Sequence, residues 1–157
     1  MNRLSNINIE NARLFFKNFR GLEDKFNRKG DRNFCVRIDP KLAEDLQIDG
    51  WNIKVVPPKD EYEEPLYYLK VSVSYNNIPP SIYFIDGRRK IAVDEDGVGA
   101  IDTLDISNID LVISPYHWEV NGKSGVKAYL KTMYVCLNRD AFADKYDFPA
   151  EDGEMPY

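Results

Sequence analysis

The sequence is poor in the residues on which most catalytic and metal sites depend. It has one histidine, His117, and two cysteines, Cys35 and Cys136, which lie far apart and form no CxxC pair. This spacing lacks the ligand pattern of a zinc site and favours buried, reduced thiols over a disulfide. No GxSxG, P-loop or GxGxxG pattern occurs. We therefore expect a protein that is not an enzyme and that needs no cofactor or metal.

Long apolar runs are also missing. The first twenty residues interleave Asn, Arg and Glu, and no stretch offers the roughly 20 apolar residues of a membrane span. We expect no signal peptide and a cytoplasmic location. With 157 residues, 43% of them hydrophobic, the chain suits a single domain with one core that needs no disulfides or metal sites for stability.

One cluster of carboxylates, at residues 94–96, has the composition of a divalent-cation loop. Aligned with an EF-hand loop, Asp94, Asp96 and Gly99 fit, but Val98 takes a ligand position and Asp105 replaces the closing Glu. We therefore prefer a solvated loop whose acids cap a helical turn.

The acidic residues are unevenly distributed. The chain has 26 Asp+Glu and 21 Lys+Arg, a net charge of −5. Six acids and one Lys lie in residues 140–157, so the remaining 139 residues carry 20 acids and 20 bases. Because this body is neutral, its bases can still cluster on one surface, and an acidic pI does not exclude a nucleic-acid partner.

Aromatic and basic residues mix most densely between Ala12 and Ile38. From Arg13 to Arg37 there are eight Lys+Arg and three Asp+Glu. Alternation along a strand would separate two faces. The face interpreted as a binding surface carries Arg13, Phe15, Lys17 and Phe19. The face interpreted as core carries Ala12, Leu14 and Phe16.

This pattern predicts binding of a single nucleic-acid strand, because bases stack on aromatic rings while Lys and Arg neutralise phosphates. A later strand repeats it with Lys127, Tyr129 and Lys131, opposite an inward set of Val126, Ala128, Leu130 and Tyr134. The alternative is that the aromatic rings fill the core and the Lys and Arg side chains only make the surface soluble. The predicted nucleic-acid-binding residues are Arg13, Phe15, Lys17, Phe19, Arg20, Lys25, Phe26, Arg28, Lys29, Arg32, Trp51, Lys54, Lys123, Lys127, Tyr129 and Lys131.

The predicted fold is mainly β, an OB-like antiparallel Greek-key barrel with one or two short helices, favoured over a sandwich. Residues 1–11 would be a polar arm, 12–146 the single-strand-binding domain and 147–157 an acidic tail. A helix should begin at Asp39-Pro40 and end at Gly50, and residues 94–105 should hold a weak helical turn. Strands are expected at 12–19, 32–38, 51–56, 66–75, 82–85, 88–93, 109–113, 116–120 and 126–137, with a bend at Ser114-Pro115 and a loop at 121–125. Phe34, Val36 and Ile38 should face the core, and residues 20–32 should form a mobile basic loop.

The last eleven residues, DFPAEDGEMPY, are acidic and contain Pro149, Gly153 and Pro156. Such a segment buries too little apolar area to offset its ordering entropy, so we expect a disordered tail. It would compete weakly with DNA for a basic groove. Its terminal Pro-aromatic pair would bind a basic, apolar pocket on a partner protein. The predicted partner-binding residues are Asp147, Phe148, Glu151, Asp152, Glu154, Pro156 and Tyr157.

Three segments resemble the small OB-fold single-stranded-DNA-binding proteins of tailed phages. They are NARLFFKNF with the following FNRKGDRNFCV, DGWNIK at Asp49–Lys54, and YHWEVNGKSGVKAYLKTMYV at Tyr116–Val135. The tail is similar to the acidic tips of replication single-strand-binding proteins, although it is less densely acidic. The resemblance implies coating of single-stranded DNA in phage replication, recombination or repair inside the infected cell. It also implies recruitment of replication or recombination proteins, and it is compatible with a homo-oligomer.

A second hypothesis assigns the acids the main role. In it, a phage protein binds a host protein as a nucleic-acid mimic or counter-defence inhibitor, through residues 60–64, 94–96 and the tail. The two hypotheses differ in surface charge, because the first requires a continuous positive groove and the second a continuous negative one.

Overall fold

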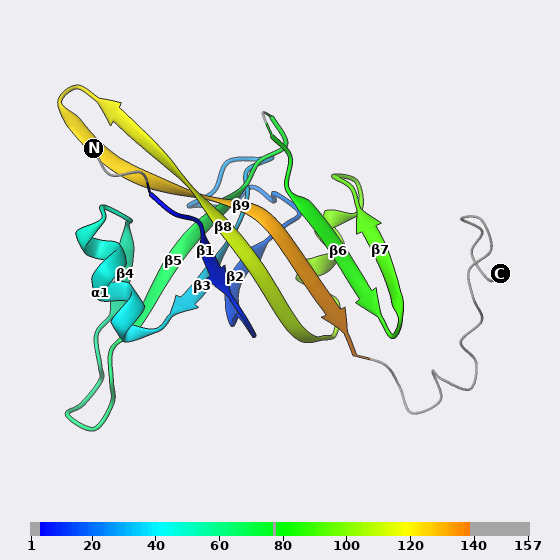
Figure 1. Cartoon of the computed structure of the whole chain (residues 1–157), viewed down its shortest axis with the longest axis horizontal. Helices are drawn as coiled ribbons and strands as arrows, with labels where there is room; N and C mark the ends of the chain where they lie inside the picture. The colour runs from blue at the N-terminus through cyan, green and yellow to red at the C-terminus, as the bar shows by residue number, and fades with distance from the viewer. Residues whose placement is uncertain (1–3, 77, 139–157) are drawn as a thin grey trace.

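The computed structural model describes residues 4–76 and 78–138 (Figure 1). Strands dominate, as the sequence predicts. They are β1 (Ile7–Ile9), β2 (Leu14–Asn18), β3 (Arg32–Ile38), β4 (Ile53–Val56), β5 (Leu66–Val73), β6 (Ser81–Asp86), β7 (Arg89–Val93), β8 (Ile106–Val120) and β9 (Lys123–Leu137). One α-helix, α1 (Pro40–Ile48), and one 3-10 helix, η1 (Val98–Asp102), complete the described elements.

The strands form one sheet in the order β1-β8-β9-β5-β3-β2, with β4 on β5 and the β6–β7 hairpin on β9. Most pairs are antiparallel, but β9 pairs in parallel with both β5 and β6. The mainly β, OB-like fold is thus confirmed. Among the described residues no ladder joins β1 to β2, so the sheet curls without closing.

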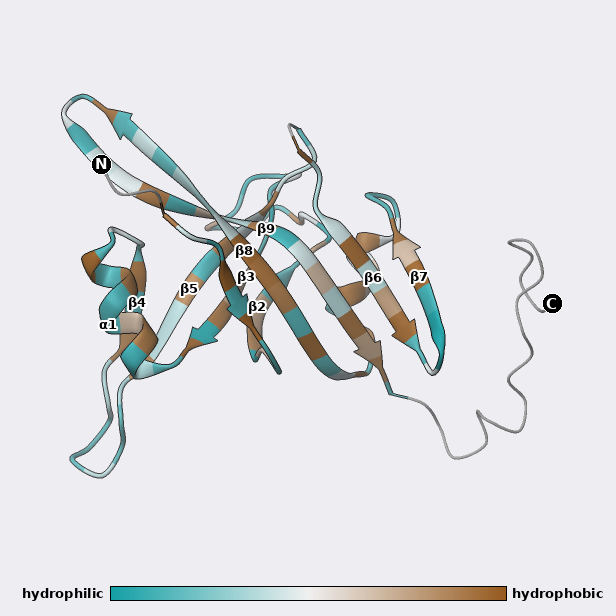
Figure 2. Cartoon of the chain, in the orientation of Figure 1, coloured by the Kyte–Doolittle hydropathy of each residue, from teal (hydrophilic) through white to brown (hydrophobic). Residues whose placement is uncertain are grey.

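The core lies on one face of this sheet, and alternation along the strands supplies it. On β3 the predicted core residues Phe34, Val36 and Ile38 are buried, while Arg37 is exposed. Alternate residues of β5 and β9 contribute in the same way: Leu69, Val71, Val73, Val126, Ala128, Leu130, Met133 and Val135. Figure 2 shows the resulting alternation of apolar and polar residues along β8 and β9.

Helix α1 begins and ends as predicted. The Asp39 side chain accepts a hydrogen bond from the Lys41 amide, and Pro40 occupies the first helical position. Gly50 then reverses the chain with a φ of +98°, a conformation that glycine adopts without strain. Ala43 and Leu46 are the buried side chains of the helix, which packs beside β5 and β4.

The face assignment on β2 is wrong beyond Phe15. Between Phe15 and Asn18 the pairing with β3 shifts by one residue, a β-bulge, and Phe16 has a φ of +50°. A bulge reverses the alternation that follows it. Phe16 is consequently 75% exposed, not core, and Phe19 is fully buried, stacked on Phe34 at 5.1 Å between ring centroids.

A second bulge corrects the prediction for Tyr134. In the β8–β9 ladder Val112 pairs with Thr132 but Ile113 with Leu130, which leaves Lys131 as the extra residue. Met133 therefore takes the inward position that simple alternation gives to its neighbours. Tyr134 points away from the core and is 37% exposed.

The β8–β9 hairpin is longer and tighter than predicted. Its turn is only Asn121-Gly122, both with positive φ, where the sequence predicted a five-residue loop. β8 also runs through Ser114-Pro115 without interruption. Beyond the β1 pairing β8 has a ladder partner on one side only, so a residue without an N–H is tolerated there.

Three smaller features complete the fold. Residues 7–9 of the expected arm form β1, which pairs with β8. The weak helical turn is η1, and the Asp94 side chain accepts a hydrogen bond from the Gly97 amide just before it. Cys35 and Cys136 are unbonded thiols. In the described part of the chain no helix is long and apolar enough to span a bilayer.

Candidate nucleic-acid interface

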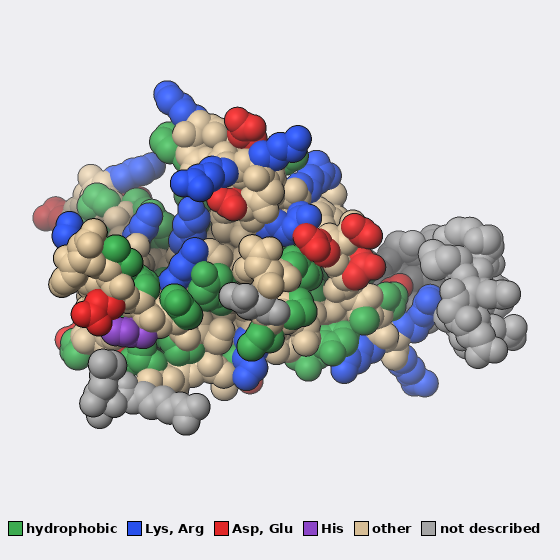
Figure 3. Space-filling model, turned by 90° about the horizontal axis from the view of Figure 1, so that it is seen from above, with side chains coloured by type: hydrophobic (Ala, Val, Ile, Leu, Met, Phe, Trp, Pro, Cys, Tyr) green, Lys and Arg blue, Asp and Glu red, His purple; other side chains and the backbone are tan. Residues whose placement is uncertain are grey.

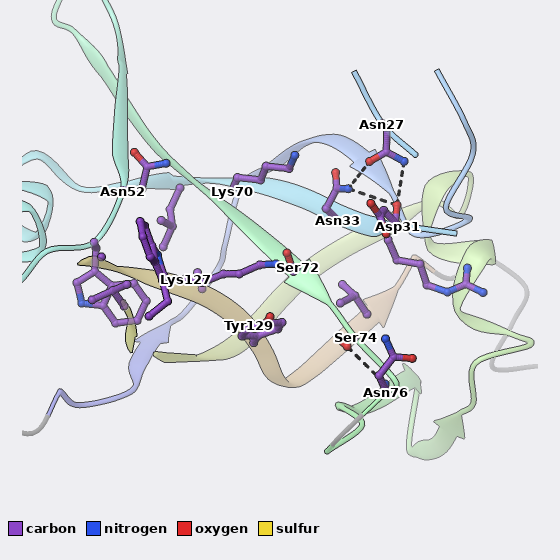
Figure 4. A pocket seen from close by; sticks show the side chains of 18 of the residues that line it. Asn27, Asp31, Asn33, Asn52, Lys70, Ser72, Ser74, Asn76, Lys127 and Tyr129 are labelled. Atoms are coloured by element: carbon purple, nitrogen blue, oxygen red, sulfur yellow. Dashed lines mark hydrogen bonds between the residues drawn. The ribbon is translucent and has the colours of Figure 1, made fainter. Parts of the chain in front are cut away.

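A groove of about 970 Å³ lies between the β8–β9 hairpin, strand β5 and the loop before β3. Figure 3 shows Lys and Arg side chains gathered around the hollowed part of this face. In the close-up, Lys70 and Ser72 from β5 lie between the β9 side chains and the loop residues, and Ser74 follows the end of β5 beside Asn76 (Figure 4). The floor is thus the polar face of the sheet whose other face is core.

The charged residues that line the groove are mostly basic. Arg28, Arg32, Lys70 and Lys127 supply four cations, and Asp31 and Glu95 supply two carboxylates. The acidic residues 60–64 do not line it. The groove therefore has a net positive lining, in a protein whose overall charge is negative.

The β8–β9 hairpin, which forms one wall of the groove, presents aromatic rings next to the basic side chain of Lys127. Trp118 pairs with Gly125 and Tyr116 with Lys127 across the ladder. A Cβ added at Gly125 would lie only 2.8 Å from Trp118 Cζ2, so glycine is needed for the indole to lie flat on the strand. The Tyr129 ring has Lys127 Nζ 5.1 Å from its centroid.

The opposite wall is the basic loop, which is tied together by one asparagine. Asn27 Nδ2 donates to the backbone oxygens of Leu22, Arg28 and Asp31, and Asn27 Oδ1 accepts from Asn33 Nδ2. A backbone hydrogen bond from Gly30 to Gly21 closes the loop at 2.7 Å. The segment predicted to be a mobile loop is therefore internally bonded, and it leaves the Phe26 ring 89% exposed at the groove.

The polar sheet face continues past the groove to an aromatic cluster. Across β2, β3 and β5, Phe15 lies opposite Cys35 and Cys35 opposite Lys70, while Lys54 lies opposite Tyr68. The Phe15 and Tyr68 rings meet edge to face at 5.2 Å. Burial raises the pKa of the Cys35 thiol, and the nearby Lys70 and Lys54 ammonium groups partly offset the rise.

At the other end of the groove, a backbone carbonyl and a carboxylate hold the Arg32 side chain in place. Its guanidinium donates to the Phe19 carbonyl at 2.6 Å, and it lies 3.9 Å from a Glu95 carboxylate oxygen. The Tyr75 hydroxyl beside them is buried without a partner among the described residues. Burial raises the pKa of Tyr75, and the nearby Arg32 partly offsets the rise.

The structure brings together only part of the predicted nucleic-acid-binding set. The groove is lined by Phe26, Arg28, Arg32, Trp51, Lys127 and Tyr129, although Trp51 is 4% exposed. Phe15 and Lys54 lie on the adjoining sheet face. Outside the groove lining are Arg13, Lys17, Arg20, Lys25, Lys29, Lys123 and Lys131.

Two of the predicted nucleic-acid-binding residues contact other parts of the protein instead of facing the groove. Phe19 belongs to the core, and Lys17 Nζ donates to the Ile101 carbonyl of η1. The Asp102 carboxylate accepts the amides of Phe19 and Arg20 at the end of β2. The predicted tail residues, 147–157, lie outside the described residues.

Sequence reasoning missed Trp118, Tyr116, Tyr68 and Lys70. A signal for the first two was present: a two-residue Asn121-Gly122 turn would have paired Trp118 with Gly125 and placed both rings beside Lys127. Alternation along residues 66–73 puts Tyr68 and Lys70 on the polar face, but nothing in the sequence shows which strands lie next to them.

Comparisons with known proteins point in one direction. In the solved structures the chain is similar to the single-stranded DNA-binding protein from bacteriophage Enc34, at 15% identity and a TM-score of 0.54 over 90% of each chain. The same phage protein in complex with ssDNA matches at 14% identity and a TM-score of 0.56, over 87% of this chain and 89% of that one. No curated protein matches the chain. The family model of the phage ssDNA-binding domain matches residues 1–155. The chain therefore belongs to the phage ssDNA-binding domain family.

Proposed function

We propose that this phage single-stranded-DNA-binding protein coats single strands with little sequence preference, through the groove and the adjoining polar sheet face. The phosphates would lie against Arg28, Lys70 and Lys127, while bases stack on the rings of Trp118 and Tyr129. Stacking of this kind contributes about 1–3 kcal/mol per base and tolerates any sequence, because every base has a π-face. The role would be protection of single strands in phage replication, recombination or repair, in the cytoplasm of the infected cell.

The observation that carries the proposal is the lining of the groove, where four cations and exposed aromatic rings face one space. The solved relative that contains ssDNA supports the same ligand. The alternative, an acidic mimic that binds a host protein, requires a negative surface at the principal groove. The net positive lining favours the strand-binding role.

The test is a titration of fluorescent oligo-dT at 50 and 200 mM salt. If Arg28, Lys70 and Lys127 each displace one counterion, the slope of log K against log salt should be about −2.1, a loss of roughly 20-fold across this range. A blunt-ended duplex of equal length is the matched control and should bind more weakly. Affinity that does not change with salt, or a duplex bound as tightly as oligo-dT, would contradict the proposal.

We further propose that residues 147–157 recruit replication or recombination proteins. Their acids and terminal Pro156-Tyr157 pair suit a basic, apolar pocket on a partner. Deleting Phe148–Tyr157 should leave the melting temperature unchanged and abolish capture of a phage or host replication protein on a single-strand column. Undiminished capture by the shortened chain would refute this role.

A further inference from the structure

A second basic and aromatic surface lies outside the groove, on the β6–β7 hairpin. The rings of Tyr83 on β6 and Tyr134 on β9 stack at 5.4 Å between centroids. Lys90 Nζ lies 4.2 Å from the Tyr83 centroid and 5.7 Å from that of Tyr134. Arg88 and Arg89 precede Lys90, so residues 86–90 carry three cations and one acid, Asp86. We call this surface, Tyr83, Tyr134 and residues 88–90, the hairpin patch.

The hairpin patch is apart from the groove. None of its residues lines the groove, and β6 and β7 lie on the side of the sheet away from the projecting end of β8 and β9 (Figure 1). Asp86 lies opposite Arg89 across the hairpin, so the patch keeps a net charge of +2. Asp110, opposite Tyr134, is already bonded to the Asn11 amide and to Asn108 Nδ2. A cationic and aromatic surface of this kind fits an acidic peptide segment that carries aromatic side chains.

The chain itself supplies such a segment, in the residues that follow β9. Residues 140–157 contain six acids, one Lys and the aromatic residues Phe142, Tyr146, Phe148 and Tyr157. They follow β9, whose Cys136 pairs with Ile85, which in turn pairs with Lys90. Two strand spacings put Lys90 roughly 10 Å from Cys136, whereas Tyr129 in the groove is seven residues, or about 23 Å, back along β9 from Cys136.

We propose that the acidic segment 140–157 docks on the hairpin patch of its own chain. Its carboxylates would pair with Arg88, Arg89 and Lys90, and an aromatic side chain would pack on the exposed edge of Tyr134. The 19 residues that follow Asn138 can span at most about 65 Å, so the groove is also within reach of the segment. The hairpin patch is favoured over the groove because it lies closer to the end of β9, where the segment is attached. A tethered ligand is most concentrated near its point of attachment. The segment that the sequence predicted to fill the DNA groove is thus assigned to a different surface.

Carbodiimide cross-linking of the full chain, without DNA, tests the assignment. This reagent joins Lys to Asp or Glu only at salt-bridge distance, and peptide mass spectrometry identifies the pairs. The expected main product joins Lys90 to a carboxylate of residues 140–157 and declines several-fold in 0.5 M NaCl. Main products at Lys70 or Lys127 would place the segment in the groove and overturn the proposal, as would equal yields at all exposed lysines.

A pair of variants separates a docking surface from a merely reactive lysine. Arg88→Gln with Arg89→Gln keeps Lys90 but removes two charges, and should lower its cross-link yield several-fold. The control, Lys41→Gln with Lys59→Gln, removes two exposed charges elsewhere and should leave the yield unchanged. Thermal melts establish that both variants are folded. Mixing ¹⁵N-labelled and unlabelled chains shows whether the link is within one chain; predominantly mixed products would overturn docking on the same chain. Because no DNA is present, either outcome leaves the proposed strand-binding function untouched.

Discussion

Replacement of Phe19 by alanine tests the bulge on β2. Simple alternation puts Phe19 on the DNA-binding face beside Phe15, whereas the structure buries it completely against Phe34. Removing a buried phenylalanine costs about 3–5 kcal/mol, a large part of the roughly 5–15 kcal/mol that stabilises a typical domain. At roughly 2–4 °C per kcal/mol for a chain of this size, Phe19→Ala should lower the melting temperature by about 6–20 °C.

The assay combines a thermal melt with an oligo-dT titration at a temperature where the variant is folded. Affinity for the strand should then stay within about twofold of the wild type. The matched variant is Phe15→Ala, whose half-buried ring lies on the polar sheet face. If a base stacks there, affinity should fall by roughly 5- to 150-fold, the equivalent of about 1–3 kcal/mol. A Phe19→Ala protein that melts normally but binds DNA ten times more weakly would refute the bulge and restore the simple alternation.

Three further predictions concern local geometry. Phe16→Gly should raise the urea midpoint by the equivalent of about 1 kcal/mol, because glycine adopts a φ of +50° without strain; a lower midpoint would show that the exposed ring stabilises the fold. Gly125→Ala should displace the Trp118 indole, shift its fluorescence and weaken oligo-dT binding, whereas the neighbouring Ser124→Ala should do neither. Cys35 should resist iodoacetamide at pH 8, because burial raises its pKa and keeps the thiol neutral; peptide mass spectrometry should show labelling only in urea, and rapid labelling of the native protein would contradict that environment.

The sequence was sufficient wherever one strand or helix could be treated alone. The Asp39-Pro40 start and Gly50 end of α1 follow from local hydrogen bonding and backbone freedom, which neighbouring residues determine. The inward positions on β3 follow from an uninterrupted alternation of Phe34, Val36 and Ile38. The OB-like class likewise followed from many short strands without βαβ units.

Predictions failed where a second strand decides the outcome. At each of the bulges at Phe16 and Lys131, one strand has one more residue than its partner between two paired positions. The sequence of either strand alone does not show this extra residue. Each bulge reversed the faces of all later residues, which explains the errors at Phe19 and Tyr134 together. The groove was only half predicted for a related reason: Lys70 reaches Lys127 through the pairing of β5 with β9, which are far apart in the sequence. Trp118 was missed because the turn at Asn121-Gly122 is shorter than predicted.

The position of β9 has a consequence for how the protein is made. This strand pairs with β8, β5 and β6, and it is the last of the described strands in the chain. Until residues 123–137 have left the ribosome, β5 and the β6–β7 hairpin lack the partner that joins them, and one wall of the groove does not exist. If single-stranded DNA binds in this groove, as proposed, a nascent chain cannot engage it until β9 has docked.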